Sequence, residues 1–165
     1  MTVPSTPASR AATLRLIIMA MTSAPLFILV VVVFVLGGFS DATLPPLWMI
    51  VGLLLLVAGA FGVARAMESQ LTPIPLGTHR EQAMSQAFQT FQANLFVRVA
   101  ILEAPLLIGI AMSFVVDHGA WPALIAGVPT LIAMVASLWP TPSTISRVEQ
   151  RLDRAGGRSY FSEGW

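Results

Sequence analysis

The chain has 165 residues, of which 56% are hydrophobic and only 10% charged, with a mean hydropathy of +0.79 and a formal net charge of +1. Soluble domains carry roughly a quarter charged residues, so this composition excludes an ordinary soluble domain and is typical of an integral membrane protein. The sequence contains no cysteine, which excludes disulfides, thiolate metal sites and cysteine nucleophiles.

Four segments are long and apolar enough to cross a membrane as helices, each of which needs about 20 residues. Three uncharged runs extend over residues 16–40, 42–64 and 119–146. The remaining segment contains Arg98 and Glu103, but the uncharged residues that follow them favour a span there as well. We therefore predict an all-α, integral membrane four-helix bundle within residues 13–142. The predicted spans lie at about residues 16–39, 45–65, 95–116 and 120–140.

The arginines indicate the orientation of the chain, because basic residues are retained on the cytoplasmic side. All nine basic residues are arginine. Apart from Arg98, they lie before the first predicted span, at the end of the second span (Arg65) and in the loop that follows it (Arg80), or after the fourth span. The other two loops contain Asp41, Asp117 and His118 and no arginine. Both termini are therefore predicted to be cytoplasmic. Cleavage of the first span as a signal peptide is the alternative, although its apolar run exceeds the roughly 7–15 residues of a signal core.

Two further segments are predicted on the cytoplasmic side, one before the first span and one between the second and third spans. Residues 1–12 are small, polar and proline-bearing, which is typical of a flexible cytoplasmic leader. Residues 80–94 form a cytoplasmic amphipathic segment with one apolar helical stripe. The stripe consists of Met84, Phe88, Phe91 and Leu95. The segment is predicted either to lie on the membrane surface or to continue directly into the third span.

The cytoplasmic C-terminal tail, residues 143–165, begins with a second amphipathic pattern. Ile145, Val148 and Leu152 fall at helical spacing and predict a short helix that ends at Gly156 and Gly157. The aromatic residues that follow, RSYFSEGW, are interpreted first as a loose tail. The alternative is that they dock on a partner or back onto the bundle.

An internal repeat relates the two halves of the predicted bundle. An offset of 80 residues aligns SAPLFI, residues 23–28, with EAPLLI, residues 103–108. Both matches fall in the first helix of a hairpin, and both helices are predicted to run from the cytoplasm outward. The chain is therefore predicted to consist of two parallel-repeat helical hairpins. The alternative is an accidental match in a chain rich in alanine, proline and leucine.

A polar site is predicted within the third span, around Glu103. A carboxyl group in hydrocarbon is costly, so Glu103 should face the interior of the bundle or another subunit. Pro105 has no amide proton, which leaves the carbonyl of Ile101 without its helical donor and close to the glutamate. A protonated Glu103 would donate a hydrogen bond to that carbonyl, to Thr22 or to Ser23.

The role of Glu103 and the position of Arg98 each have two interpretations. Arg98 lies five residues before Glu103, about 140° around a helix, so we expect it to extend to the cytoplasmic headgroups. The alternative is a buried arginine that pairs with Glu103. For Glu103, the favoured interpretation is a neutral acid that holds helices together, and the alternative is proton carriage or ion coupling.

The second hairpin resembles a known group of proteins. The segment from FVRVAILEAPLLIGIAMSFV through SLWPTPS is similar to a family of small bacterial inner-membrane proteins with four helices. In that family the third helix has an arginine followed by Leu-Glu-(Gly or Ala), and the last helix ends in Pro-Thr. The resemblance implies a multi-pass protein of the bacterial cytoplasmic (inner) membrane, and it implies no activity.

These observations favour a non-enzymatic integral membrane protein that is a subunit or accessory factor of a larger membrane assembly. The alternative is a small proton-linked transporter or channel formed by oligomerisation around Glu103. An enzyme is not predicted, because no nucleophile, base and orienting group fall at one depth. The expected partners are the lipid bilayer and either copies of the same chain or other membrane subunits. No cofactor, metal or nucleic acid is expected.

Overall fold

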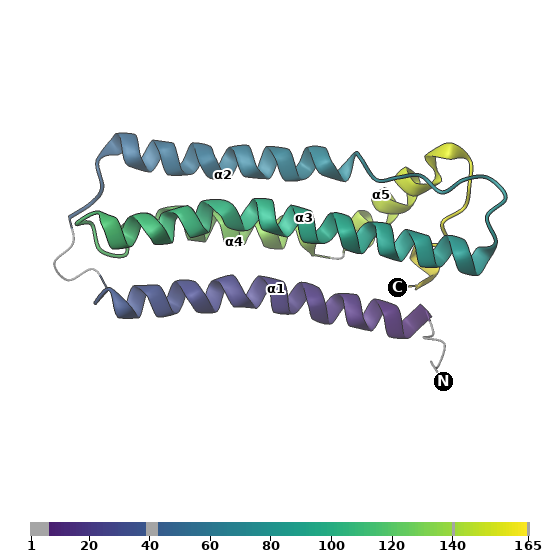
Figure 1. Ribbon diagram of the computed structural model, residues 1–165, viewed down its shortest axis with the longest axis horizontal. Helices are drawn as coiled ribbons and strands as arrows, with labels where there is room; N and C mark the ends of the chain where they lie inside the picture. The colour runs from purple at the N-terminus through teal and green to yellow at the C-terminus, as the bar shows by residue number, and fades with distance from the viewer. Residues whose placement is uncertain (1–6, 39–42, 140, 165) are drawn as a thin grey trace. The chain divides into compact units, whose positions relative to one another are not determined.

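Five α-helices form the chain in the computed structural model, which describes residues 7–38, 43–139 and 141–164 (Figure 1). The helices are α1 (Pro7–Val35), α2 (Leu47–Glu68), α3 (Arg80–Val115), α4 (Trp121–Leu138) and α5 (Pro142–Leu152). Two short 3-10 helices follow, at Asp153–Ala155 and Ser162–Gly164. The described residues contain no strand, so the prediction of an all-α chain is confirmed for them.

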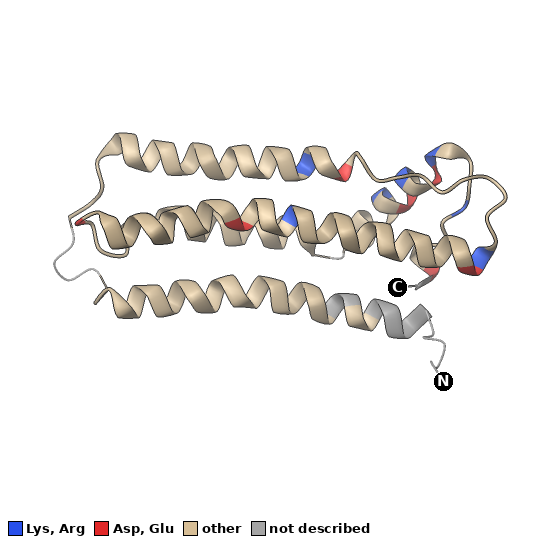
Figure 2. Cartoon of the chain, viewed as in Figure 1, with Lys and Arg blue, Asp and Glu red and all other residues tan. Residues whose placement is uncertain are grey.

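Four of the helices are long and apolar enough to cross a membrane, in agreement with the predicted number of spans. The candidate spans are Leu16–Val35 in α1, Leu47–Glu68, Arg80–Val115 and Trp121–Leu138. Figure 2 shows how acidic and basic residues interrupt the middle of α3, where Arg98 and Glu103 lie. Four such helices indicate a multi-pass membrane protein.

Two helices begin earlier than the corresponding predicted spans. α1 begins at Pro7, so residues 7–12 of the predicted leader are helical, and residues 1–6 lie outside the described part of the chain. α3 runs without a break from Arg80 to Val115. At about 1.5 Å per residue it is roughly 54 Å long, whereas the hydrocarbon core of a bilayer is about 30 Å thick. The amphipathic segment therefore continues directly into the third span.

Local sequence explains where several helices begin and end. α1 ends at Val35 and is followed by Gly37 and Gly38, which adopt φ angles of 71° and 73° that few other residues accept. Before α5, the side chain of Thr141 accepts a hydrogen bond from the backbone N–H of Thr144 and caps the helix. Gly156 has a φ of 83° and ends the helical tail segment, as predicted.

The described residues form two compact units. The apolar unit comprises the described residues within 20–65 and 98–137, and the tail unit comprises the described residues within 7–19, 66–97 and 138–164. The apolar unit contains most of each candidate span, whereas the tail unit contains the segments predicted to be cytoplasmic.

α4 is the most enclosed helix of the apolar unit. One apolar cluster joins α1, α3 and α4 and contains Leu29, Val32, Leu106 and Ala123. A second cluster joins α2 and α4 and contains Met49, Leu53 and Ala126. In the candidate spans, 50% of the α4 residues are buried, compared with 39% for α3 and 22% for both α1 and α2. α4 therefore packs against the other helices, while α1 and α2 expose most of their apolar surface.

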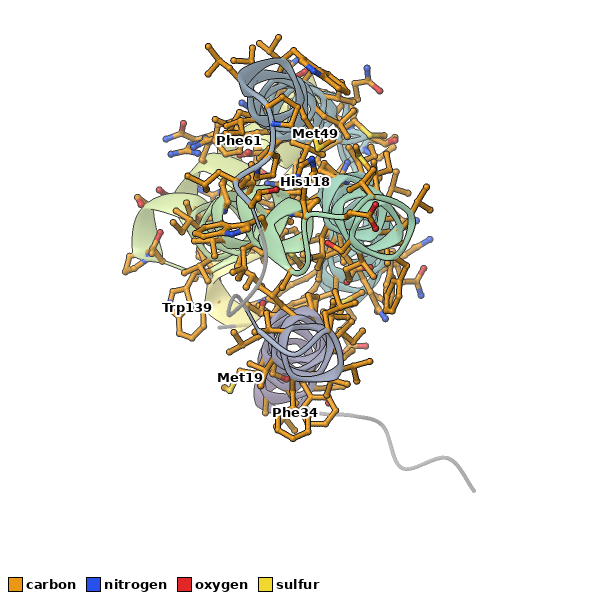
Figure 3. The ribbon with its side chains drawn as sticks, turned by 90° about the vertical axis from the view of Figure 1, so that its left-hand side faces the viewer. Met19, Phe34, Met49, Phe61, His118 and Trp139 are labelled. Atoms are coloured by element: carbon orange, nitrogen blue, oxygen red, sulfur yellow. The ribbon has the colours of Figure 1, made fainter. Side chains whose placement is uncertain are left out.

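The exposed apolar side chains lie outside these clusters. Phe34 is 86% exposed, and Figure 3 shows its ring pointing away from α1. Leu55 on α2 is 67% exposed and Ile132 on α4 is 64% exposed. Soluble monomers rarely expose so much apolar surface to water, which indicates that this surface faces lipid or other proteins.

The tail unit has its own apolar core, in which the two predicted amphipathic stripes meet. The stripe of α3 and the stripe of α5 both contribute to one buried cluster. Its members include Leu71, Ile74, Met84, Phe88, Phe91, Val148, Leu152 and Phe161, with Ile145 partly buried against it. The predicted stripes are confirmed, and each buries the apolar side chains of the other.

The aromatic end of the chain completes this core. Phe161 is fully buried, and its ring centroid lies 5.1 Å from that of Phe88 and 5.2 Å from that of Phe91. Around it, Glu149 accepts hydrogen bonds from the backbone N–H and the hydroxyl of Ser162, and Arg80 pairs with Glu163. The favoured prediction of a loose tail is therefore wrong for residues 158–164, which dock back onto their own chain. An aromatic ring leaves water readily when two helical stripes provide an apolar surface for it.

Candidate functional site

The close approach of α3 and α4 begins at Gly109. A Cβ atom at this position would lie 2.7 Å from the carbonyl oxygen of Pro122 and 2.7 Å from the Cβ of Ala126. Small residues allow this kind of contact between membrane helices. The absence of a side chain at Gly109 is therefore what lets the two backbones meet.

Ser113, one turn further along α3, caps the first turn of α4. Its hydroxyl oxygen accepts a hydrogen bond from the backbone N–H of Ala123 at 2.9 Å and donates one to the carbonyl of Gly109 at 3.0 Å. The first four N–H groups of a helix have no partner within it, so a side chain from a neighbouring helix is needed in an apolar setting. This role of Ser113 was not predicted, because the only signal for it in the sequence is a hydroxyl in an apolar run.

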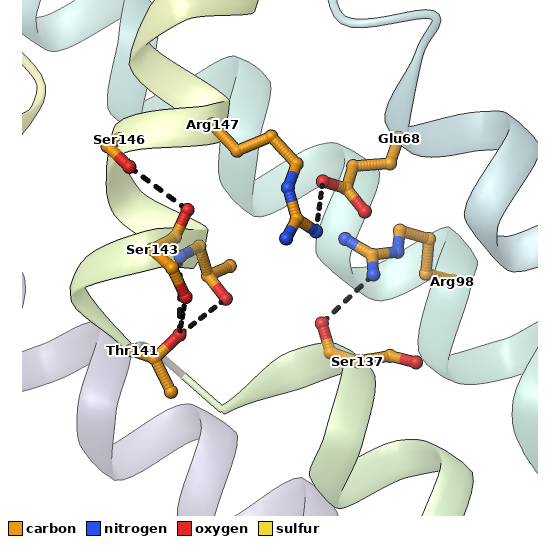
Figure 4. A network of polar contacts seen from close by, with 8 residues as sticks. Glu68, Arg98, Ser137, Thr141, Ser143, Ser146 and Arg147 are labelled. Carbon is orange, nitrogen blue, oxygen red and sulfur yellow. Dashed lines mark hydrogen bonds and ion pairs between the residues drawn. The ribbon is translucent and has the colours of Figure 1, made fainter.

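Arg98 binds the opposite end of α4. Its side chain is only 2% exposed, and Nη2 donates a hydrogen bond to the carbonyl of Ser137 at 3.0 Å (Figure 4). The last carbonyls of a helix lack helical donors and carry partial negative charge, which favours a cation there. The guanidinium is therefore bound to a buried acceptor at the end of α4, while its depth relative to the headgroups stays a prediction.

α3 thus holds α4 at both ends. Arg98 and Ser113 are about 22 Å apart along α3, and Ser137 and Ala123 are about 21 Å apart along α4, at 1.5 Å per residue. The two antiparallel helices therefore match in length between their polar contacts. This match fixes the register of the second hairpin.

Glu68, which the sequence analysis did not single out, forms a second buried polar contact within the tail unit. It is the last residue of α2 and is 3% exposed, and its Oε1 lies 3.6 Å from Nη1 of Arg147 on α5 (Figure 4). A buried carboxylate requires a paired charge or hydrogen bonds. The signal in the sequence was an acid directly after a span, followed by a basic amphipathic helix far along the chain.

Glu103 is half-buried on α3, and no hydrogen bond or ion pair joins it to any other described residue. Pro105, two residues later, is fully buried inside the same helix. Neither predicted acceptor on α1 is bonded to it. The hydroxyl of Ser23 is exposed and donates to the carbonyl of Ala20 at 3.1 Å, while Thr22 is half-buried and has another partner. The structure therefore places a carboxyl group in a candidate span without a polar contact from the described residues.

The two loops predicted to be external are joined by a histidine. Nδ1 of His118 lies 3.1 Å from the carbonyl oxygen of Thr43, to which it donates, and 3.2 Å from the hydroxyl of the same threonine. Asp117 is exposed beside it, and Asp41 lies outside the described residues. In the part of the chain that the structure describes, no group of three or more metal-ligating side chains is placed to hold a metal ion.

Comparison with known proteins identifies no relative. No protein-family description, no curated protein and no solved structure matches the chain. The resemblance of the second hairpin to small four-helix inner-membrane proteins therefore stays a prediction. The described chain is helical, with four candidate transmembrane helices and an α3–α4 pair that is bonded at both ends. One carboxyl group, that of Glu103, lies in a candidate span without a hydrogen-bond partner among the described residues.

Proposed function

We propose that the chain is a non-enzymatic integral membrane protein that serves as a subunit or accessory factor of a larger membrane assembly. The observation that supports this proposal is Glu103, which lies in a candidate span without a hydrogen-bond partner among the described residues. Hydrocarbon supplies no hydrogen bonds, so a partner from outside the chain would lower the cost of this carboxyl group. The largely exposed apolar faces of α1 and α2 offer further surface for such a partner.

The proposed architecture is a four-helix bundle of two parallel-repeat hairpins, α1–α2 and α3–α4. At the offset of 80 residues, the ends of α1 and α3 coincide at Val35 and Val115. Both helices also contain a buried proline at the aligned position, Pro25 and Pro105. These coincidences favour a duplication over an accidental sequence match.

The two proposed hairpins differ in what holds them together. The position aligned with Arg98 is Ile18, and the position aligned with Ser113 is Val33. The first hairpin therefore lacks the side chains that bind both ends of α4. α1 and α2 instead contact α4 through two separate apolar clusters. Apolar contacts leave a helix more freedom to adjust to a partner, which fits an accessory role.

The proposed location is the bacterial cytoplasmic (inner) membrane, with both termini in the cytoplasm. Apart from Arg98, the basic residues lie in segments that this orientation places inside. Trp48 and Trp121 lie at the start of α2 and α4, and Trp139 follows the end of α4. Tryptophans at both ends of spans are typical of membrane interfaces.

Thiol labelling tests the orientation, because the native chain has no cysteine to compete. A single cysteine at the exposed Asp117 is expected to react with an impermeant reagent in intact cells. A single cysteine at the exposed Arg158 is expected to react only after the membrane is made permeable. Labelling at Arg158 in intact cells, with none at Asp117, would show that the orientation is reversed.

Purification in mild detergent tests the proposed function. We expect the full chain to copurify with at least one other membrane protein in fixed stoichiometry, measured by mass spectrometry of the intact complex. Glu103→Leu is expected to weaken this association, because it removes the group that needs a partner, whereas Glu103→Gln retains a donor and an acceptor. A preparation that contains the chain and no second protein under all mild conditions would contradict an accessory role.

The unpaired Glu103 also favours a second candidate, a small proton-linked transporter or channel formed by oligomerisation around this residue. A carboxyl group releases protons and an amide does not. A pH-driven flux in liposomes that the wild type produces and Glu103→Gln abolishes, with unchanged thermal stability, would support this candidate over the accessory role. We expect no such flux and expect Glu103→Gln to be tolerated.

A further inference from the structure

The outward face of α3 combines an apolar seam with the unpaired carboxyl group. Within the apolar unit, the exposed or half-buried positions of this face alternate at spacings of three and four residues. They are Ala100, Glu103, Leu107, Ile110 and Phe114. Leu102, Leu106 and Gly109, on the neighbouring face of α3, are buried against the rest of the chain. Ile110, at the edge between the two faces, is partly buried against the same apolar cluster as Leu106. The alternating spacing is that of helices that pack with a small left-handed crossing angle.

We propose that this face, here called the α3 seam and defined by Ala100, Glu103, Leu107, Ile110 and Phe114, binds the same face of a second copy of the chain. The inference deepens the proposed function by naming one partner in the assembly. A carboxylic acid both donates and accepts hydrogen bonds, so two Glu103 side chains that share a proton satisfy each other. Two identical acids are therefore chemically complementary without any further group.

Membrane topology supplies the geometry of this contact. Copies inserted in the same orientation carry their α3 helices in parallel, and every residue of one copy lies at the same depth as its equivalent in the other. Glu103 of one copy consequently meets Glu103 of the other when the seams form a twofold interface. A second copy therefore supplies a polar group at the matching depth without any further requirement.

The position of Glu103 within the seam also sets the register. Ala100 and Leu107 lie about one turn before and after it and would meet their equivalents. A polar residue within an otherwise apolar seam disfavours shifted pairings, because each shift leaves the polar group without its partner. The small side chain of Ala100, together with the exposed Ala104 and Ala111 beside the seam, allows the backbones to approach closely.

Disulfide trapping of full-length single-cysteine variants in liposomes tests the proposal, because the chain supplies no other thiol. Ala100→Cys and Leu107→Cys are expected to form covalent dimers on mild oxidation. The control for Ala100 is Ala58→Cys, at an exposed alanine of α2. The controls for Leu107 are Leu55→Cys on α2 and Ile132→Cys on α4, which are also apolar and exposed, at 67% and 64%. All three control variants keep the α3 seam and are expected to form no covalent dimer at the same protein-to-lipid ratio.

A second set of variants separates the role of the carboxyl group from that of the apolar surface. In the Leu107→Cys background, Glu103→Leu is expected to weaken dimerisation in a dilution series by about tenfold, whereas Glu103→Gln changes it little. Equal trapping at the control positions, or full dimerisation of the Glu103→Leu variant, would overturn the proposal.

The same measurements distinguish this inference from the proposed function on which it rests. Copurification of another membrane protein without trapping at the α3 seam would overturn the α3 seam as a self-association site while supporting the accessory role. Trapping at the α3 seam in a preparation that holds no other protein would support self-association and contradict the accessory role.

Discussion

Phe161→Ala is expected to destabilise the tail unit by about 3–5 kcal/mol, the range found when a fully buried phenylalanine is truncated. The ring of Phe161 has no exposed surface and contacts Phe88 and Phe91 of α3. Its removal leaves a cavity between the apolar stripes of α3 and α5. Hydrogen exchange of the full chain in detergent measures the effect, and we expect amide protection in residues 83–91 to fall by at least about a hundredfold.

Phe34→Ala provides the matched control for this prediction. Its ring is 86% exposed on α1 and belongs to the apolar unit, so protection of the tail unit should not change. If Phe161→Ala and Phe34→Ala gave the same exchange profile over residues 83–91, the docked position of the C-terminal segment would be incorrect. A loss of protection confined to residues 158–164 would lead to the same conclusion.

Gly109→Ala is expected to destabilise the α3–α4 pair by about 1–3 kcal/mol, although alanine is the better helix former by about 1 kcal/mol. The added Cβ would lie 2.7 Å from both the carbonyl oxygen of Pro122 and the Cβ of Ala126. Neither atom lies at the end of a flexible side chain, so the helices must move apart. This movement would also lengthen the hydrogen bond from Ala123 to Ser113.

Gly59→Ala, in the middle of α2, tests whether the effect depends on the contact. No heavy atom beyond its own helix lies within 4 Å of the position of its Cβ among the described residues. This substitution should leave thermal stability in detergent unchanged or raise it, since it gains helix propensity without a clash. The prediction for Gly109 fails if both alanine variants change the melting temperature in the same direction and by similar amounts.

The sequence was sufficient to predict properties that depend only on a single helix and on the solvent around it. A continuous apolar run gives the same free-energy advantage in hydrocarbon wherever its neighbours lie, so the four candidate spans were predictable. The stripes through Phe88 and Val148 were predictable for a similar reason, because helical geometry fixes which side chains share a face. Gly156, at the end of the helical tail segment, follows from backbone sterics alone.

The placement of polar side chains within the fold could not be predicted in the same way. Arg98 was expected among the headgroups, since a single helix offers it no acceptor. Its acceptor is the carbonyl of Ser137, which lies 39 residues further along the chain. The pairing of Glu68 with Arg147 likewise joins distant segments of the tail unit. Whether a buried charge is tolerated depends on how far it lies from a polar partner. Hydropathy along the sequence does not predict that distance.

The sequence by itself determined the class of molecule, the number of its candidate spans and the amphipathic faces of its other helical segments, because these follow from transfer free energies and from helical periodicity. Tertiary structure alone decided that Phe161 lies in a core, that Arg98 and Ser113 hold the ends of α4, and that Glu103 has no polar contact among the described residues. Each of these outcomes depends on which atoms meet across segments separated in sequence. Buried hydrogen bonds and close packing act over only a few ångströms, so they become defined when the helices are packed.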